Sequence, residues 1–313
     1  TRSDYVFNAN SSHWLSNVNA PLEGYSIVYG PEQTIRSPRT RMNAKLLEEV
    51  SPTGVSGADG KFSLTELKNV VTGERALLSE LLQDDVAARC AGKSNITLLD
   101  LSVVDISAAC TVITDWDGLY SNESVGAHVF RELMNEYKSG TERVLKAELF
   151  ETDFDATNPV TTPSGLKARA NDATDNTDPV LLALANAVTK LAAYNFPLTA
   201  KLGDLQFHMK NADRISIPGG GSVDGVFNIN AAATIPNAGY AVVHGASWVM
   251  ALEFTDEGPV ADAWLTYGQS HDPESEHYSD QTELFSAGTW RPVLFTDDAI
   301  QNDLKSSKTL TID

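Results

Sequence analysis
The hydrophobic period of the chain changes near Leu202, and this change constrains the fold more than any other feature. Before it, apolar residues recur at helical spacing, and after it they alternate with other residues as in strands. One helical stripe comprises Leu77, Leu78, Leu81 and Leu82, and a second comprises Val125, Val129, Phe130, Leu133 and Tyr137. A helical part followed by a strand part predicts the α+β class.

The strand part predicts an antiparallel sheet. Residues 207–217 and 226–229 are expected to contribute strands, followed by a hairpin with its turn at residues 256–259. Ahead of this turn, Trp248, Met250, Leu252 and Phe254 alternate with three intervening residues, and Ala261, Ala263 and Leu265 alternate after it. We therefore expect this hairpin to have one apolar face.

Four segments divide the chain. Residues 1–38 read as strand and loop because prolines and glycines interrupt any helical pattern, and residues 39–150 read as helical. Within the helical segment, Ser63 and Glu66 have the spacing of a capping box. Residues 151–179 are rich in Thr, Asp, Asn and Pro and predict a surface loop or insertion, which could also be a mobile lid. Residues 180–313 read as a helix followed mainly by antiparallel sheet.

The composition excludes several classes of partner. Lys and Arg number 23 against 42 acidic residues, giving a net charge of -19, so we expect neither a nucleic-acid partner nor binding to an anionic membrane. No apolar run approaches the roughly 20 residues that cross a bilayer, which predicts a soluble chain. No signal peptide is visible, and Tyr5-Val6-Phe7 reads as a strand. The chain is thus expected to begin inside folded structure, as a processed or excised piece would.

Motifs for other chemistries are incomplete. Neither Ser247 nor Ser270 has the second glycine of a nucleophile elbow, and the cluster around His271 and His277 fits no zinc motif. The glycine run ending at Gly221 precedes a strand, which predicts a tight turn and not a phosphate site. We therefore expect no cofactor and no metal ion.

The opening segment, Phe7-Asn8-Ala9-Asn10-Ser11-Ser12-His13-Trp14, crowds amide side chains between aromatic residues. If it is extended, Asn8 and Asn10 face one side and could line a cleft. Alternatively, it is a polar loop that turns on its own side chains. A carboxamide N–H suits an oxyanion hole because it can donate to a developing negative oxygen without ionising.

Further motifs follow this segment along nearly the whole chain. They are Pro-Leu-x-Gly from Pro21, Arg39-Thr-Arg41, Phe62 to Lys68, Cys110 to Gly118, the turn from Pro218 to Gly221, Tyr267 to Ser270, His277 to Gln281, and Trp290-Arg291-Pro292. In this order they resemble the later part of the β subunit of the penicillin amidase superfamily of N-terminal nucleophile hydrolases. The likeness is strongest to the branch that contains aculeacin acylases and acyl-homoserine lactone acylases.

The resemblance implies a heterodimeric amidohydrolase with a four-layer αββα fold, matured by autoproteolysis. In that family a serine at the start of the β subunit is the nucleophile, and its free amine is the base. Matching the motifs assigns the oxyanion asparagine to Asn10. It assigns the arginine that supports the active site to Arg39, with Arg41 as second choice.

The sequence departs from the family in one respect. The family nucleophile lies far upstream of the oxyanion asparagine, whereas nine residues precede Asn10, so Thr1 is not expected to be the nucleophile. We read residues 1–313 as the C-terminal part of a β subunit, inactive when isolated, whose partners are the α chain and the remainder of the β chain. The resemblance also implies a periplasmic or secreted protein, in which we expect Cys90 and Cys110 to form a disulfide.

Two functions from different classes follow. The first is hydrolysis of a linear amide bond in a small acylated amine such as a β-lactam, a lipopeptide or an acyl-homoserine lactone. The second is a non-catalytic extracellular binding or structural module on an acylase-like scaffold.

Overall fold

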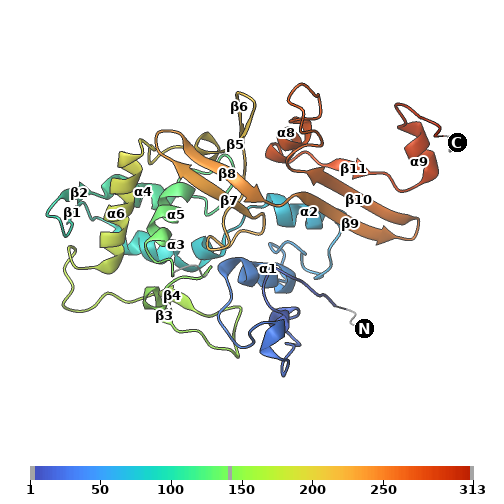
Figure 1. Cartoon of the computed structure of the whole chain (residues 1–313). Coiled ribbons are helices and arrows are strands. Elements are labelled where there is room, and N and C mark those ends of the chain that lie inside the picture. Colours follow the sequence, from blue (N-terminus) through green and yellow to red (C-terminus); the bar gives the residue numbers. More distant parts are fainter. Residues whose placement is uncertain (1–3, 140–142, 311–313) are drawn as a thin grey trace.

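The computed structural model describes residues 4–139 and 143–310, which form an α+β structure in which most helices lie at one end and the last two lie beside the final strands (Figure 1). The helices are α1 (Pro38–Glu48), α2 (Leu64–Thr72), α3 (Leu77–Cys90), α4 (Ser107–Asp115), α5 (Ala127–Asn135), α6 (Pro179–Ala193), α7 (Leu202–Leu205), α8 (Asp280–Ser286) and α9 (Asp297–Asn302). The strands are β1 (Asn95–Thr97), β2 (Val103–Asp105), β3 (Phe150–Thr152), β4 (Ser164–Leu166), β5 (Gln206–Lys210), β6 (Asp213–Ser216), β7 (Asn230–Ile235), β8 (Gly239–Gly245), β9 (Trp248–Thr255), β10 (Gly258–Leu265) and β11 (Arg291–Val293). The predicted α+β class is confirmed.

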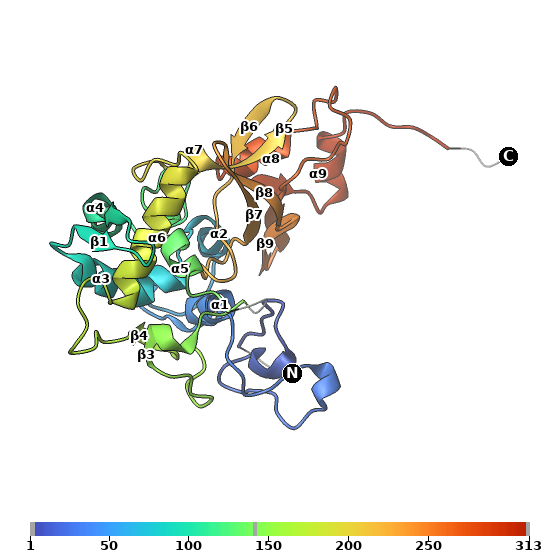
Figure 2. The same ribbon diagram turned by 60° about the vertical axis from the view of Figure 1, so that its left-hand side comes forward.

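The main hydrophobic core lies among α3, α4, α5 and α6 (Figure 2). Leu78 and Leu82 of α3 are buried there, as are Phe130 and Leu133 of α5, so the two predicted apolar stripes are core faces. Ser63 and Glu66 form the predicted capping box, in which each side chain accepts a hydrogen bond from the other residue's backbone N–H. The helix predicted from residue 179 is α6.

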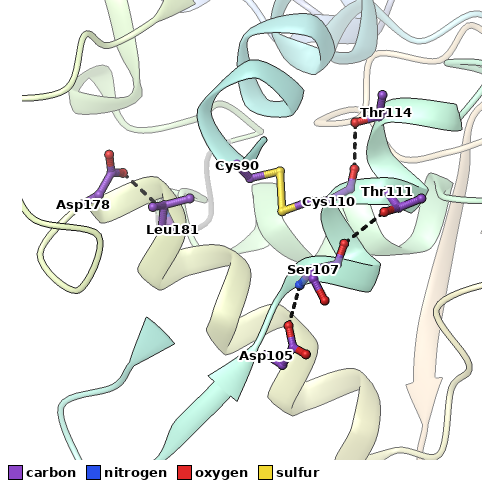
Figure 3. Close-up of a disulfide and its surroundings, with 8 residues drawn as sticks. All are labelled: Cys90, Asp105, Ser107, Cys110, Thr111, Thr114, Asp178 and Leu181. Atoms are coloured by element: carbon purple, nitrogen blue, oxygen red, sulfur yellow. Dashed lines mark hydrogen bonds between the residues drawn. A yellow bond between two sulfur atoms is a disulfide. The ribbon is translucent and has the colours of Figure 1, made fainter. Parts of the chain in front are cut away.

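A disulfide joins α3 to α4. Cys90 ends α3, Cys110 lies within α4, and the bond links them inside the helical core (Figure 3). The predicted pairing is confirmed. Because the bond closes a loop with a sequence separation of 20 residues, it restricts the unfolded chain and holds the β1–β2 hairpin between two fixed points.

The strands form two main sheets, whereas the alternating pattern in the sequence predicts a single antiparallel sheet. The first has the order β6-β5-β8-β7, in which β5 and β8 are parallel and the other pairs antiparallel. The second has the order β11-β10-β9 and is antiparallel. The prediction of a strand at residues 226–229 is wrong, because Ile229 makes an isolated bridge to Gly220 and Asn228 donates its side chain to Glu74.

The β9–β10 hairpin has the predicted turn, but its packing differs from the expectation. Val249 and Trp264 lie in a buried cluster, and Glu253 accepts a hydrogen bond from the first residue of α2. The opposite row is open, with Trp248 54% and Phe254 80% exposed. On β9, the apolar row identified in the sequence therefore lies on the more exposed face, whereas its continuation on β10 at Ala261 and Ala263 is buried.

The predicted strand at residues 5–7 is also wrong. The segment before α1 contains two short 3-10 helices, His13–Leu15 and Ile27–Tyr29, and no strand among residues 4–37. The backbone N–H of Phe7 donates to the backbone oxygen of Ser16 at 2.9 Å. This contact within the segment uses a backbone group that a strand would pair with a neighbouring strand. Arg36 secures the segment by stacking over Trp14, 5.0 Å from its ring centre.

Within residues 4–139 and 143–310, no helix is both long and apolar enough to cross a membrane.

Candidate active site
Asn10 and Arg39, selected from different parts of the sequence, are in direct contact. Nη2 of Arg39 donates to Oδ1 of Asn10 at 2.8 Å and to the backbone oxygen of Ala9 at 2.6 Å. Asn10 has a left-handed backbone with φ of 58°, and its N–H donates to the side chain of Asn8 at 2.8 Å. The segment is therefore the polar loop of the two alternatives, and Asn8 and Asn10 do not line one side of a strand.

This contact fixes the orientation of the Asn10 amide. Because the guanidinium has no acceptor atoms, it selects the carbonyl oxygen of the amide. The amide nitrogen, Nδ2, is then left as a donor, and it has no acceptor among the residues that the structure describes. Asn10 is exposed, so this donor is accessible.

Arg39 is held at the start of α1. Ser37 caps this helix by accepting from the N–H of Thr40, and Pro38 occupies its first turn. The N–H of Arg39 donates to the backbone oxygen of Ser222 at 3.0 Å, and its Nε donates to the Ser222 hydroxyl at 3.3 Å. Burial lowers the pKa of Arg39, and the positive charge of Arg143 lowers it further. All of these hydrogen-bond partners are neutral groups.

A glycine-rich turn carries Ser222. The N–H of Gly221 donates to Oδ2 of Asp224 at 2.7 Å, while the backbone oxygens of Asp224 and Gly225 accept from the first residues of α3. Gly225 has a φ of +83°, and a Cβ there would lie 2.7 Å from the Cβ of Leu77. The tight turn predicted from the glycine run is present, and it joins α3 to the Arg39 contact.

Asn10 and Ser222 line a cavity of about 760 Å³ that extends over β7 and β8. Arg131 lines another part of it, between the rings of Tyr120 and Tyr240 at 5.0 and 5.3 Å. Arg131 donates to Gln206 at 2.9 Å and lies 3.4 Å from the Asp224 carboxylate, but its Nη2 has no partner among the described residues. The cavity wall thus combines the exposed amide of Asn10 with charged side chains of both signs, among them Arg131, Glu132 and Asp224.

Arg41, the second-choice arginine, faces another part of the molecule. Its side chain donates to the backbone oxygens of Val160 at 2.8 Å and Pro163 at 2.9 Å, and burial lowers its pKa to about 10. These contacts tie the 151–179 segment to α1. We infer that Arg41 supports the scaffold by holding residues 160–163 against α1.

Replacing Arg41 by methionine should lower the free energy of unfolding by about 2 kcal/mol, because two backbone oxygens lose their donor. In the complete enzyme, kcat should stay within about twofold, since hydrogen bonds distant from the reacting atoms add little to transition-state binding. Urea unfolding and steady-state kinetics on the same preparation would check this. A large loss of kcat with unchanged stability would instead favour Arg41 as the supporting arginine.

Sequence reasoning missed Ser222 and Arg131. Ser222 follows a glycine run that indicates only a turn, and its partner is 183 residues away. Arg131 lies within α5 but outside its apolar stripe, where helical spacing predicts an exposed charged residue, yet it is 8% exposed. Thr1, the terminal residue excluded as nucleophile, lies outside the described residues.

Comparison with known proteins supports the motif order. The family model described as penicillin amidase matches residues 1–302. The chain belongs to the penicillin amidase family. It is 37% identical over 305 residues to aculeacin-A acylase of Actinoplanes utahensis and 28% identical over 303 residues to acyl-homoserine lactone acylase PvdQ of Pseudomonas syringae pv. syringae (strain B728a).

These matches cover 96% of the chain but 36% of each relative. The chain therefore spans about one third of the length of these penicillin amidase family members. Both relatives are acylases by name, which supports amide hydrolysis at the level of the family.

Proposed function
We propose that the chain is part of an enzyme that hydrolyses a linear amide bond and releases an acyl group from an amine. The observation that carries this proposal is the Arg39 contact, which holds Asn10 by its oxygen and leaves the amide nitrogen as an accessible donor beside the cavity. In this role Asn10 donates to the oxyanion of the tetrahedral intermediate, and Arg39 is a positioning residue.

The nucleophile comes from the part of the enzyme upstream of this chain. Its hydroxyl adds to the amide carbonyl while its own free amine takes the proton. The carbonyl oxygen becomes negative and accepts a hydrogen bond from Nδ2 of Asn10. The ammonium group then gives this proton to the amide nitrogen, and collapse of the intermediate breaks the C–N bond, releases the neutral amine and leaves an acyl-enzyme ester. Water then hydrolyses the acyl-enzyme ester and regenerates the hydroxyl.

The remaining parts of the proposal concern the rest of the enzyme. An α chain and the upstream β segment complete a four-layer αββα fold, which is supported by the open apolar row on β9. The isolated chain is inactive because it lacks the nucleophile. The enzyme works in the periplasm or outside the cell, a location supported by the Cys90–Cys110 disulfide.

The test is hydrolysis by the complete enzyme, with the upstream chain present. It would be incubated separately with a long-chain acyl-homoserine lactone, an acylated cyclic lipopeptide and a penicillin, and the acid and amine would be quantified by mass spectrometry. We expect equal amounts of acid and amine from at least one of them. Binding of these compounds without release of either product would favour the non-catalytic module instead.

A further inference from the structure
A second cavity, of about 310 Å³, lies apart from Asn10, between the end of α2, the loop at residues 121–123, β10 and α8. Residues from the helical part of the chain and from its later sheet part form the wall of this cavity. Those that bear on its chemistry are Val71, Glu74, Asn122, Trp264 and Phe285, while Glu123 also lines the cavity but is largely exposed and paired with Lys201. The volume is at the lower end of the range for small-molecule sites.

Glu74 supplies a buried carboxyl group to this cavity. The residue is 4% exposed, and its Oε1 accepts a hydrogen bond from Nδ2 of Asn228 at 2.8 Å. Its other oxygen, Oε2, is buried and has no partner within the described parts of the chain. Its backbone oxygen accepts from the N–H of Tyr120 at 2.9 Å, so the residue is held from two directions. A buried polar atom without a partner is costly, and it needs a ligand or water to satisfy it.

Asn122 supplies a second acceptor. Its Nδ2 donates to the backbone oxygen of Ser286 at 3.1 Å, which fixes the amide and leaves Oδ1 buried. Oδ1 likewise has no donor among the residues described. Glu74 and Asn122 both line this cavity and each carries a buried oxygen without a partner among the described residues, so a ligand that reaches these oxygens must carry hydrogen-bond donors.

The other side of the cavity is apolar and aromatic. Trp264 and Phe285 meet edge to face with their ring centres 5.6 Å apart, and Trp264 is fixed by donating to the backbone oxygen of Thr289 at 2.6 Å. Val71 at the end of α2 adds a methyl surface. Apolar and aromatic side chains favour contact with alkyl groups, so this wall suits the hydrocarbon part of a ligand.

We propose that this cavity binds a small primary alkylammonium ion, whose –NH₃⁺ group donates to Oε2 of Glu74 and Oδ1 of Asn122 while its alkyl chain packs against Trp264 and Phe285. The three N–H groups of the ammonium can donate to the Glu74 oxygen, the Asn122 oxygen and one water molecule. A divalent metal fits less well, because the described residues contain no group of three acidic, histidine or cysteine side chains arranged to hold one.

Binding at this site is linked to a proton. Burial raises the pKa of Glu74 to about 8, opposed by the hydrogen bond from Asn228, so the carboxyl is largely protonated near neutral pH. The other acid that lines the cavity, Glu123, is largely exposed and paired with Lys201. An ammonium ion therefore displaces the Glu74 proton to the buffer and should bind more tightly as the pH rises.

The experiment is calorimetric titration of the complete enzyme with n-butylammonium chloride. We expect at least tenfold tighter binding at about pH 9 than at about pH 6, because the site must lose a proton at the lower pH. Glu74→Gln keeps the size and the Asn228 contact but removes the charge, and it should weaken binding at least tenfold at the higher pH. The matched control, Glu123→Gln, should change the affinity by less than about twofold, because this exposed carboxylate is already paired.

Several outcomes would overturn the proposal. Equal affinity at the two pH values, equal affinity in Glu74→Gln, or no binding would each do so. Tighter binding of potassium or calcium in competition would replace the ammonium assignment with a metal. If Glu74→Gln does not fold, titration of the wild type near pH 7 in two buffers of different ionisation enthalpy decides, and release of about one proton per bound ion supports the site.

Discussion

Replacement of Asn10 by alanine is expected to lower kcat of the complete enzyme about 100-fold or more, with KM changed much less. In the proposed mechanism the amide nitrogen of Asn10 donates to the oxyanion, which exists in the intermediate and not in the bound substrate. Loss of one such donor typically costs about 2.7 to 4 kcal/mol of transition-state stabilisation. Steady-state kinetics with a substrate that the wild type hydrolyses would measure this.

Two further variants distinguish donation from packing. Asn10→Asp keeps an oxygen for Arg39 but has no amide nitrogen, so it should lose as much kcat as the alanine variant. Asn8→Ala removes the acceptor of the Asn10 backbone N–H and should cost less than about tenfold, the scale of one neutral hydrogen bond. Wild-type turnover in Asn10→Asp would rule out a donor role for the amide.

The pH dependence of stability should change when Glu74 is replaced by glutamine. The folded-state pKa of Glu74, about 8, is above its ordinary value of 4.5. Between these two values the folded protein keeps a proton that the unfolded chain loses, so stability falls as the pH rises. Relative to Glu74→Gln, the wild type should lose up to about 5 kcal/mol of its free energy of unfolding across this range.

Urea unfolding of both proteins at intervals from about pH 4.5 to pH 9, in buffers without amines, would measure this difference. The difference should be constant below the lower pKa and again above the upper one. The contribution of the exposed acidic residues to the pH dependence of stability cancels in this difference, because both proteins contain them. A difference that does not vary with pH would show that Glu74 ionises normally in the folded protein.

Local signals in the sequence predicted much of the secondary structure. The Ser63–Glu66 capping box and the apolar stripes of α3 and α5 depend on residues within one helix, so the pattern suffices. The β9–β10 hairpin also depends on neighbouring residues. The prediction of a strand at residues 5–7 was wrong because backbone groups of this segment are bonded within local turns. The alternation of apolar residues carries no information about such turns.

Long-range packing was not predictable from such patterns. Which face of β9 packs on α2 depends on residues almost 190 positions apart, such as Leu64 and Glu253. The division into two sheets depends on the parallel pairing of β5 with β8, which a hairpin pattern does not reveal. Alternation identifies two faces of a strand, but not which of them the rest of the molecule covers.

The candidate site shows the same limit. Asn10 and Arg39 were selected through a family resemblance, and the structure brings them into contact. Residue spacing alone suggested a strand that would align Asn8 with Asn10, whereas the left-handed backbone of Asn10 turns the chain. Ser222 contacts Arg39 only because the fold places the turn after β6 against α1, and no local sequence pattern indicates this contact.

A double-mutant cycle on Asn10 and Arg39 tests the central claim most directly, namely that the arginine acts by holding the amide. The variants are Asn10→Ala, Arg39→Met and the pair together, each compared with wild type by kcat in the complete enzyme. If Arg39 acts through Asn10, the double variant should be no slower than Asn10→Ala, within about threefold, because residues that act as a unit are not additive. Multiplicative losses in the double variant would show that the two residues act independently and would contradict the account.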